Sequence, residues 1–264
     1  MNQVKSADGT LIAYDRLGGD GVPLIVVGGA TCDRSVTRHT AEALAEHMPV
    51  VNYDRRGRGD SGDTAPYSVL REVEDLAALV EAAGGQAAVY GHSSGAALVM
   101  HAAASGVPMT KIVLHEAPYG PDTEESRRAT REYGEQVRGL LAAGRDGDAL
   151  ALFFRLTGMP AEVVEGLRGE PWWRRLEANA PTLAYDSEVM GDLVRGGTLC
   201  EELPAAIHAP TLVISGGASP DWMIATGQRI ADLNPRARHE VLAGRQHVVP
   251  PEILAPVVAA FLAG

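Results

Sequence analysis

The segment Gly91-His92-Ser93-Ser94-Gly95 constrains the fold more than any other part of the chain. The apolar run at residues 87–90 precedes it and a run of small residues at 96–100 follows it, so a strand, a sharp turn and a helix are expected in that order. The flanking glycines allow the strand and helix backbones to approach closely, and the turn strains the serine. The pattern predicts that the Ser93 hydroxyl is exposed at the carboxyl end of a strand.

Other apolar runs have the length of strands that are buried on both faces of a sheet. They lie at Leu24–Val27, Val50–Tyr53, 112–114 and 211–214, with a further strand-like run at 239–242. Helical spacing separates several of them, most clearly at Val69, Val73, Leu76 and Val80. Alternating strands and helices predict an α/β fold with a mostly parallel, doubly wound sheet. The opening residues predict a hairpin, because Asp8-Gly9 is a turn dipeptide followed by a strand-like run.

The alternation stops after residue 114. Between about residues 120 and 206 we find no strand pattern, only helical segments interrupted by Gly and Pro. The strand and helix alternation resumes at Thr211. We therefore expect a sheet core formed by residues 1–119 and 207–264, with residues 120–206 inserted as a helical cap.

A serine hydroxyl is a poor nucleophile until a base removes its proton, so a histidine is needed near the same sheet edge. His247 meets this need, because it follows the last strand-like run and precedes Pro250-Pro251, which opens the final helix. Five other histidines fall in helical or connecting segments, namely His39, His47, His101, His208 and His239, and His92 is expected to pack beside the turn. We interpret Ser93 as the nucleophile and His247 as its base. The Ser94 amide and the following helix would face a developing oxyanion.

The composition excludes several other classes of function. The formal net charge of the 264 residues is -11, and the arginines are scattered among carboxylates, so a nucleic-acid partner is not expected. Cys32 and Cys200 are too few for a disulfide framework, and no His or carboxylate cluster has metal-ligand spacing. No apolar run reaches the ~20 residues that cross a bilayer. We expect a soluble cytoplasmic protein with a small-molecule substrate and neither metal nor cofactor; whether it forms a homo-oligomer is left open.

These motifs make the chain similar to the α/β-hydrolase fold family over nearly its whole length. Besides the serine turn and the terminal histidine, residues 53–61 resemble the D-x-R-G-x-G-x-S turn that many members carry after their fourth strand. The three matches occur in family order. The turn at 53–61 lacks the lysine and spacing of a phosphate-binding loop, and we interpret it as part of the scaffold.

The resemblance also implies an oxyanion hole. Family members commonly carry His-Gly after the third strand, and this chain has Gly28-Gly29-Ala30 instead. Backbone amides can serve without that histidine, so the resemblance implies Ala30 and Ser94 as the two donors. Cys32 is close enough in sequence to line the pocket, although a buried, inert thiol is its expected role.

The sequence offers two carboxylates to orient His247. Many relatives place the acid a few residues after the strand that corresponds here to 211–214, but Ser219 occupies that position and Asp221 comes two residues late. Other relatives place a glutamate directly after the preceding strand, where this chain has Glu116. We favour Glu116 narrowly and keep Asp221 as the alternative.

The nucleophile narrows the expected chemistry to acyl transfer, because dehalogenases and epoxide hydrolases of this fold attack with aspartate. We expect hydrolysis of an ester, lactone or thioester in a small to medium apolar substrate, through an acyl-enzyme. The alternative is a ligand-binding or non-hydrolytic member of the same fold, resembling an isomerase or receptor. Aromatic residues are candidates to line the substrate site or to pack the core of the cap; they are Phe153, Phe154, Trp172, Trp173 and Trp222.

Overall fold

The computed structural model describes residues 1–264, and it contains one eight-stranded sheet in the order β1-β2-β4-β3-β5-β6-β7-β8. β2 pairs antiparallel with β1 and β4, and all other neighbours pair in parallel. The strands are β1 (Asn2–Lys5), β2 (Leu11–Leu17), β3 (Leu24–Val27), β4 (Val50–Tyr53), β5 (Ala87–His92), β6 (Met109–His115), β7 (Thr211–Gly216) and β8 (Ala237–Leu242). The predicted α/β class is therefore confirmed.

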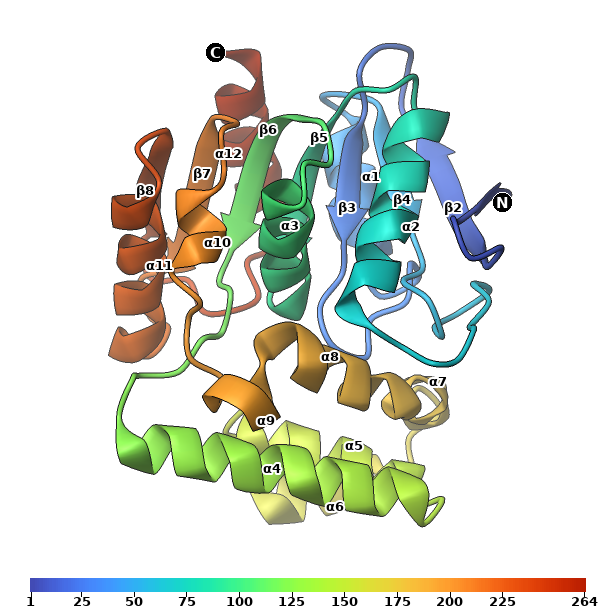
Figure 1. The fold of residues 1–264 in the computed structure, drawn as a ribbon, viewed down its shortest axis with the longest axis vertical. Helices are drawn as coiled ribbons and strands as arrows, with labels where there is room; N and C mark the ends of the chain where they lie inside the picture. The colour runs from blue at the N-terminus through green and yellow to red at the C-terminus, as the bar shows by residue number, and fades with distance from the viewer.

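Helices cover both faces of the sheet and bury two separate apolar clusters against it. The larger cluster lies under α2 (Val69–Ala82), α3 (Ser94–Ala104) and α11 (Asp221–Leu233). The smaller one lies under α1 (Arg38–Ala45) and α12 (Pro251–Ala263), which contact each other behind the sheet in Figure 1. α3 is largely apolar and is the most buried of these helices, and it directly follows the turn at Ser93.

The chain between β6 and β7 contains helices joined by loops and no strand. We call the helices α4 to α9 the cap layer; they are α4 (Glu124–Ala142), α5 (Asp146–Leu156), α6 (Ala161–Leu167), α7 (Trp173–Ala178), the 3₁₀ helix η1 (Ala180–Thr182), α8 (Leu183–Met190) and α9 (Asp192–Arg195). Figure 1 shows the arrowheads of β3 and β6 pointing toward this layer. α10 (Glu202–Ala205), within the range predicted for the cap, contacts α3 and α11 of the core instead.

The strands extend beyond the apolar runs that predicted them. β5 continues to His92 and β6 to His115, and these two histidines are paired in the parallel register. Polar residues can occupy these positions because they stand at the carboxyl ends of the strands, where the core ends and the cap layer begins. The polar ends of β5 and β6 therefore mark the sheet edge at which the candidate site lies.

Candidate active site

Ser93 occupies the sharp turn between β5 and α3. Its backbone has a φ of 57° and a ψ of -128°, a combination that is rare for residues with a side chain. A Cβ atom at Gly91 would lie 2.6 Å from the Gly95 carbonyl oxygen, and one at Gly95 would collide with the Val27 carbonyl. The Ser93 amide donates to the His115 carbonyl at 2.9 Å. The predicted strand, turn and helix are thus present around a half-buried serine.

Glu116 lies directly after β6 and is the carboxylate that contacts His247. Its Oε2 atom is 2.6 Å from His247 Nδ1, and its Oε1 atom accepts the Gly216 amide at 2.7 Å. A φ of 48° turns the Glu116 side chain inward toward these partners. Asp221 is exposed in the first turn of α11, and it forms no hydrogen bond with His247. Of the two predicted acids, the structure joins only Glu116 to the histidine.

His247 is held on the loop between β8 and α12 by its backbone as well as by Glu116. A Cβ atom at Gly216 would lie 2.7 Å from the Gln246 carbonyl oxygen, so the loop packs directly on the end of β7. His92 Nε2 donates to the His247 carbonyl at 3.0 Å, and the two rings stand 4.6 Å apart. Because a carbonyl only accepts, this bond requires the hydrogen of His92 to be on Nε2.

The protonation states around His247 follow from burial and these hydrogen bonds. Burial raises the pKa of Glu116, but the hydrogen bonds from His247 and the Gly216 amide outweigh it and hold that pKa below its usual range. Burial, with the charge of His247, lowers the pKa of His92 to about 4. At neutral pH Glu116 is therefore ionised and His92 uncharged. Glu116 then accepts the Nδ1 hydrogen of His247 and leaves Nε2 of that ring able to take a proton.

The Ser93 hydroxyl forms no hydrogen bond in the structure. His247 lies close to His92, the residue before Ser93, and the two rings pack against each other at a tilt of 35°. Hydrogen bonds between catalytic groups are often long or poorly aligned before substrate is bound. Ser93, Glu116 and His247 thus lie at the same end of the sheet, and of the three only Glu116 and His247 are hydrogen-bonded to each other.

The two amides implied for the oxyanion hole come from two different segments of the chain. Ser94 is the first residue of α3, and Ala30 follows β3 on the loop that begins at Gly28. Neither amide donates to a protein acceptor. A Cβ atom at Gly29 would lie 2.9 Å from the Ser93 Cβ atom, so the backbone of this loop packs directly against Ser93. Both amides are free to bind an anionic oxygen.

Three arginines of the turn at 53–61 are buried, although the sequence indicated only a scaffold. Arg55 forms a bidentate pair with Glu72, with both distances at 2.7 Å, and Arg56 forms a second one with Asp75. Arg58 binds both carboxylate oxygens of Asp186 in α8, at 2.9 Å each, and donates to the Gly29 carbonyl at 2.5 Å. The sequence shows three arginines within four positions, which could have indicated a buried charge cluster. It does not show that Asp186 of the cap layer is a partner of Arg55 and Arg58.

The candidate aromatic residues divide into two groups. Trp173 is 2% exposed and packs with Val137, Leu150 and Val164 in the apolar cluster of the cap layer, in keeping with the second of the two roles that the sequence left open. Phe153 and Phe154 are half-buried against the same cluster, as is Ala30 from the oxyanion loop. Trp172 and Trp222 are exposed. The cap's apolar cluster therefore reaches the loop beside Ser93.

A cavity of about 580 Å³ opens beside His247. Its walls come from the end of α5, the loop after β7 and the histidine loop, and they are largely polar. The lining residues are Thr157, Ala218, Ser219, Pro220, Asp221, Gln246 and His247. It contains one carboxylate and no lysine or arginine, so it does not favour an anionic group.

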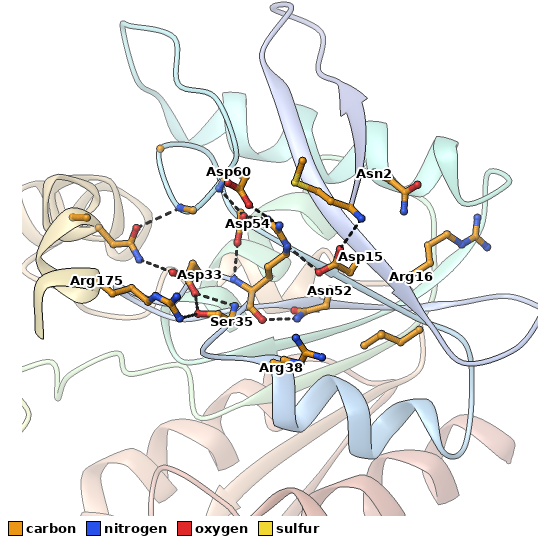
Figure 2. A pocket seen from close by; sticks show the side chains of 17 residues that line it. Asn2, Asp15, Arg16, Asp33, Ser35, Arg38, Asn52, Asp54, Asp60 and Arg175 are labelled. Carbon is orange, nitrogen blue, oxygen red and sulfur yellow. Dashed lines mark hydrogen bonds and ion pairs between the residues drawn. The ribbon is translucent and has the colours of Figure 1, made fainter. Parts of the chain in front are cut away.

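Figure 2 shows a larger cavity, of about 880 Å³, that lies apart from these residues. Ser93, Glu116 and His247 do not line it. Arg34 crosses the cavity and pairs with Asp15, Asp54 and Asp60. Three carboxylates thus surround Arg34. His247 lines the smaller cavity, whereas Ser93 and Glu116 line neither of the two.

Comparison with known proteins places the chain in a family. Residues 24–260 match the alpha/beta hydrolase family. An alpha/beta hydrolase from Sphaerobacter thermophilus is 46% identical, with a TM-score of 0.88 over 99% of this chain and 100% of that one. A hydrolase from Pseudomonas aeruginosa is 25% identical, with a TM-score of 0.78 over 100% of this chain and 98% of that one. The chain belongs to the α/β-hydrolase family.

A curated relative is the N-formylmaleamate deformylase of Pseudomonas putida. It is 32% identical over 153 residues, which are 56% of this chain. The match spans 57% of that enzyme's own length. The relatives are thus hydrolases. No helix of the chain combines the length and apolarity needed to cross a bilayer, and no group of three His, Cys, Asp or Glu side chains is arranged to hold a metal ion.

Proposed function

We propose that the chain is a cofactor-independent serine hydrolase that works through an acyl-enzyme at Ser93. The observation that carries this proposal is the 2.6 Å bond between His247 Nδ1 and the buried Glu116 carboxylate, beside the strained Ser93 turn. An ionised acid, an oriented imidazole and a serine at one sheet edge are the parts that acyl transfer requires. The family membership and the names of the relatives support the same class of reaction.

In the proposed reaction His247 Nε2 takes the Ser93 proton while Ser93 Oγ attacks the substrate carbonyl carbon. The carbonyl oxygen becomes an oxyanion that accepts hydrogen bonds from the Ala30 and Ser94 amides. The oxyanion collapses, the bond to the leaving group breaks, and His247 gives its proton to the leaving group. Water then attacks the acyl-enzyme while His247 takes its proton; the bond from the acyl carbon to Ser93 Oγ breaks as His247 returns that proton to Oγ, and the free acid departs. Glu116 stabilises the imidazolium ion in both halves of the reaction.

The two sides of the site suggest different roles. The leaving group departs toward its proton donor, His247, and the cavity there is polar. The Ala30 side adjoins the apolar cluster of the cap with Phe153 and Phe154. We therefore propose a small to medium apolar acyl group and a polar leaving group that carries no negative charge. The bond is an ester, lactone or thioester, and the deformylase name of one relative adds N-formyl amides to the compounds to be tested.

Labelling with a fluorophosphonate, followed by peptide mass spectrometry, tests the mechanism. We expect one modified residue, Ser93, and no labelling of the Ser93→Ala variant, which retains the small side chain that the turn accommodates. The matched control is Ser105→Ala, since Ser105 ends α3 away from the site. Labelling elsewhere, or none with intact protein, would remove the serine-hydrolase proposal and favour a ligand-binding role.

Acetate esters with matched leaving groups test the polarity of the two sides. Esters of neutral or cationic alcohols should be hydrolysed at least about tenfold faster, as kcat/KM, than an ester whose alcohol carries a carboxylate. The Asp221→Asn variant should narrow this difference, because it removes the carboxylate of the cavity. Equal rates for all three esters would show that the cavity beside His247 does not receive the leaving group.

A further inference from the structure

A buried cluster of side chains joins the cap layer to both amides of the oxyanion hole. We call Asp186, Arg58, Arg55 and Ser94 the Asp186 cluster; all four are buried. Asp186 comes from α8, whereas the other three come from the core. We propose that Asp186 and Arg58 are positioning residues that set the direction of the Ala30 and Ser94 amides. This inference rests on the proposed function, in which those amides bind the oxyanion.

The bond from Arg58 acts on the Ala30 amide through a single peptide unit. Arg58 Nη1 donates to the Gly29 carbonyl at 2.5 Å. The Gly29 carbonyl and the Ala30 N–H belong to the same planar trans peptide, so they point in opposite directions. Fixing the carbonyl against the guanidinium therefore fixes where the N–H points. The positive charge on the carbonyl also polarises the peptide and makes its N–H a stronger donor.

Asp186 acts on the second amide, that of Ser94, by binding the Ser94 side chain. Ser94 Oγ donates to Asp186 Oδ1 at 2.7 Å, and Ser94 is the first residue of α3. This bond ties the beginning of the helix to the carboxylate. The Asp186 oxygens also accept both bonds from Arg58, so one carboxylate sets the Ser94 tether and the orientation of the guanidinium. The two amides are thus held relative to each other through Asp186.

The charges in this region balance without help from solvent. Arg55 and Arg58 face Glu72 and Asp186, with Arg55 Nη1 also donating to Asp186 at 2.8 Å. Burial raises the pKa of Asp186, but Arg58 and Arg55 outweigh it and keep the carboxyl ionised at neutral pH. Removing one charge alone would leave another buried and unpaired, which destabilises a fold strongly. Removing Arg58 and Asp186 together leaves the Arg55 and Glu72 pair intact.

A matched ion pair separates positioning from simple stabilisation. Arg56 lies between Arg55 and Arg58 and makes a bidentate pair with Asp75 of α2, with both distances at 2.7 Å. Both side chains are buried like those of Arg58 and Asp186. Neither bonds to the oxyanion loop or to Ser94. Arg56 Nη1 also donates to Asp8 at 2.9 Å, so loss of Arg56 and Asp75 removes at least as many buried contacts without touching either amide.

The experiment compares the double variants Arg58→Met/Asp186→Asn and Arg56→Met/Asp75→Asn with the unmodified protein. Thermal unfolding reports the loss of stability in each. Hydrolysis of 4-nitrophenyl acetate gives kcat and KM per active site, counted with fluorophosphonate. A methyl trifluoromethyl ketone serves as the probe of the oxyanion hole, because its adduct with serine places an oxyanion there.

We expect the Arg58→Met/Asp186→Asn variant to lose about 10- to 10²-fold in kcat with KM changed less than about threefold, a loss below the full cost of one oxyanion donor. Its affinity for the ketone should fall by a similar factor. The Arg56→Met/Asp75→Asn variant should lose stability but keep kcat and ketone affinity within about threefold. The positioning role is wrong if Arg56→Met/Asp75→Asn loses as much kcat and ketone affinity as Arg58→Met/Asp186→Asn. It is also wrong if Arg58→Met/Asp186→Asn keeps its kcat and ketone affinity. If the unmodified protein is not labelled at Ser93, the proposed function itself is wrong, and the inference with it.

Should Arg58→Met/Asp186→Asn fail to fold, Arg58→Lys replaces it. Lysine keeps the charge but has a single nitrogen, whereas Arg58 uses Nη1 for the Gly29 carbonyl and Nη2 for both Asp186 oxygens. An intermediate ketone affinity, between those of the unmodified protein and a Ser94→Ala variant, then supports the positioning role. Unchanged affinity in both variants contradicts it.

Discussion

The sheet edge and the cap layer contribute to the site in different ways. At the edge, backbone conformation places the reacting groups: Ser93 and Glu116 both have positive φ, and glycine packing holds the loop of His247. The cap layer contributes through side chains that cross to the core, above all Asp186. Under the proposed function, the carboxyl ends of the strands would therefore hold the reacting groups, while the cap layer would set the geometry of the oxyanion hole.

The largest expected effect comes from the base at the edge. His247→Ala should reduce kcat/KM on 4-nitrophenyl acetate by about 10⁴-fold or more, because the serine proton has no acceptor. Acylation itself should fail, so rapid-mixing experiments should show no burst of nitrophenol. The control is His239→Ala, whose ring binds Ser215 of β7 and Gln228 of α11 and does not contact Ser93, Glu116 or His247. A preserved burst in His247→Ala would place the base elsewhere.

The acid at the edge gives the next largest effect. Glu116→Gln should lower kcat by roughly 10²- to 10⁴-fold, since the amide keeps the shape but cannot stabilise the imidazolium ion. Asp221→Asn should lower kcat on a neutral ester less than about threefold, because its carboxylate does not contact His247. Steady-state kinetics on both variants measures the difference. The opposite order would assign the acid to Asp221.

Local patterns predicted the edge better than the cap. The Ser93 turn was predictable because its strand, glycines and helix are adjacent in sequence, and the fold class followed from the alternation of apolar runs. The sequence narrowed the acid that contacts His247 to two candidates, Glu116 and Asp221, because the choice depends on how two loops reach His247. Asp186 was not predicted, because it meets Ser94 across 92 positions of sequence and no periodicity marks that contact. Trp173 was open to two interpretations until the helices of the cap were packed together.

Within the cap, the buried tryptophan should affect stability more than chemistry. Trp173→Ala should lower the free energy of unfolding by about 3–5 kcal/mol, the usual cost of removing a large buried aromatic side chain. The kcat of the folded fraction on 4-nitrophenyl acetate should change little. Trp172→Ala is the matched control, because its side chain is 43% exposed and should cost less than about 0.5 kcal/mol. Denaturant unfolding of both variants measures the contrast, and equal costs would contradict the assignment of Trp173 to the cap's core.

The smallest effect concerns Asp192, a carboxylate of the cap whose pKa is shifted in the opposite direction to that of Glu116. Burial, with a contribution from the charge of Asp186, raises the pKa of Asp192 to about 7, although Ser187 and Arg195 act against it. Unfolded aspartate has a pKa of about 3.9. Between these values the folded chain binds the extra proton, so the contribution of Asp192 to stability falls as pH rises from about 4 to 7 and then stays constant.

Asp192→Asn removes this titration, so the variant should not lose the stability that the unmodified protein loses between pH 5 and pH 8. We expect the difference in thermal midpoint between variant and unmodified protein to grow by at least about 2 °C over that range, the shift that 1 kcal/mol produces in a domain of this size. Glu116 does not confuse the measurement: its pKa is lowered in the folded chain, so its stabilising effect is complete above the unfolded value and is lost only at acidic pH. A constant difference from pH 5 to 8 would show that Asp192 is ionised in the folded cap, and that burial there is offset by Arg195.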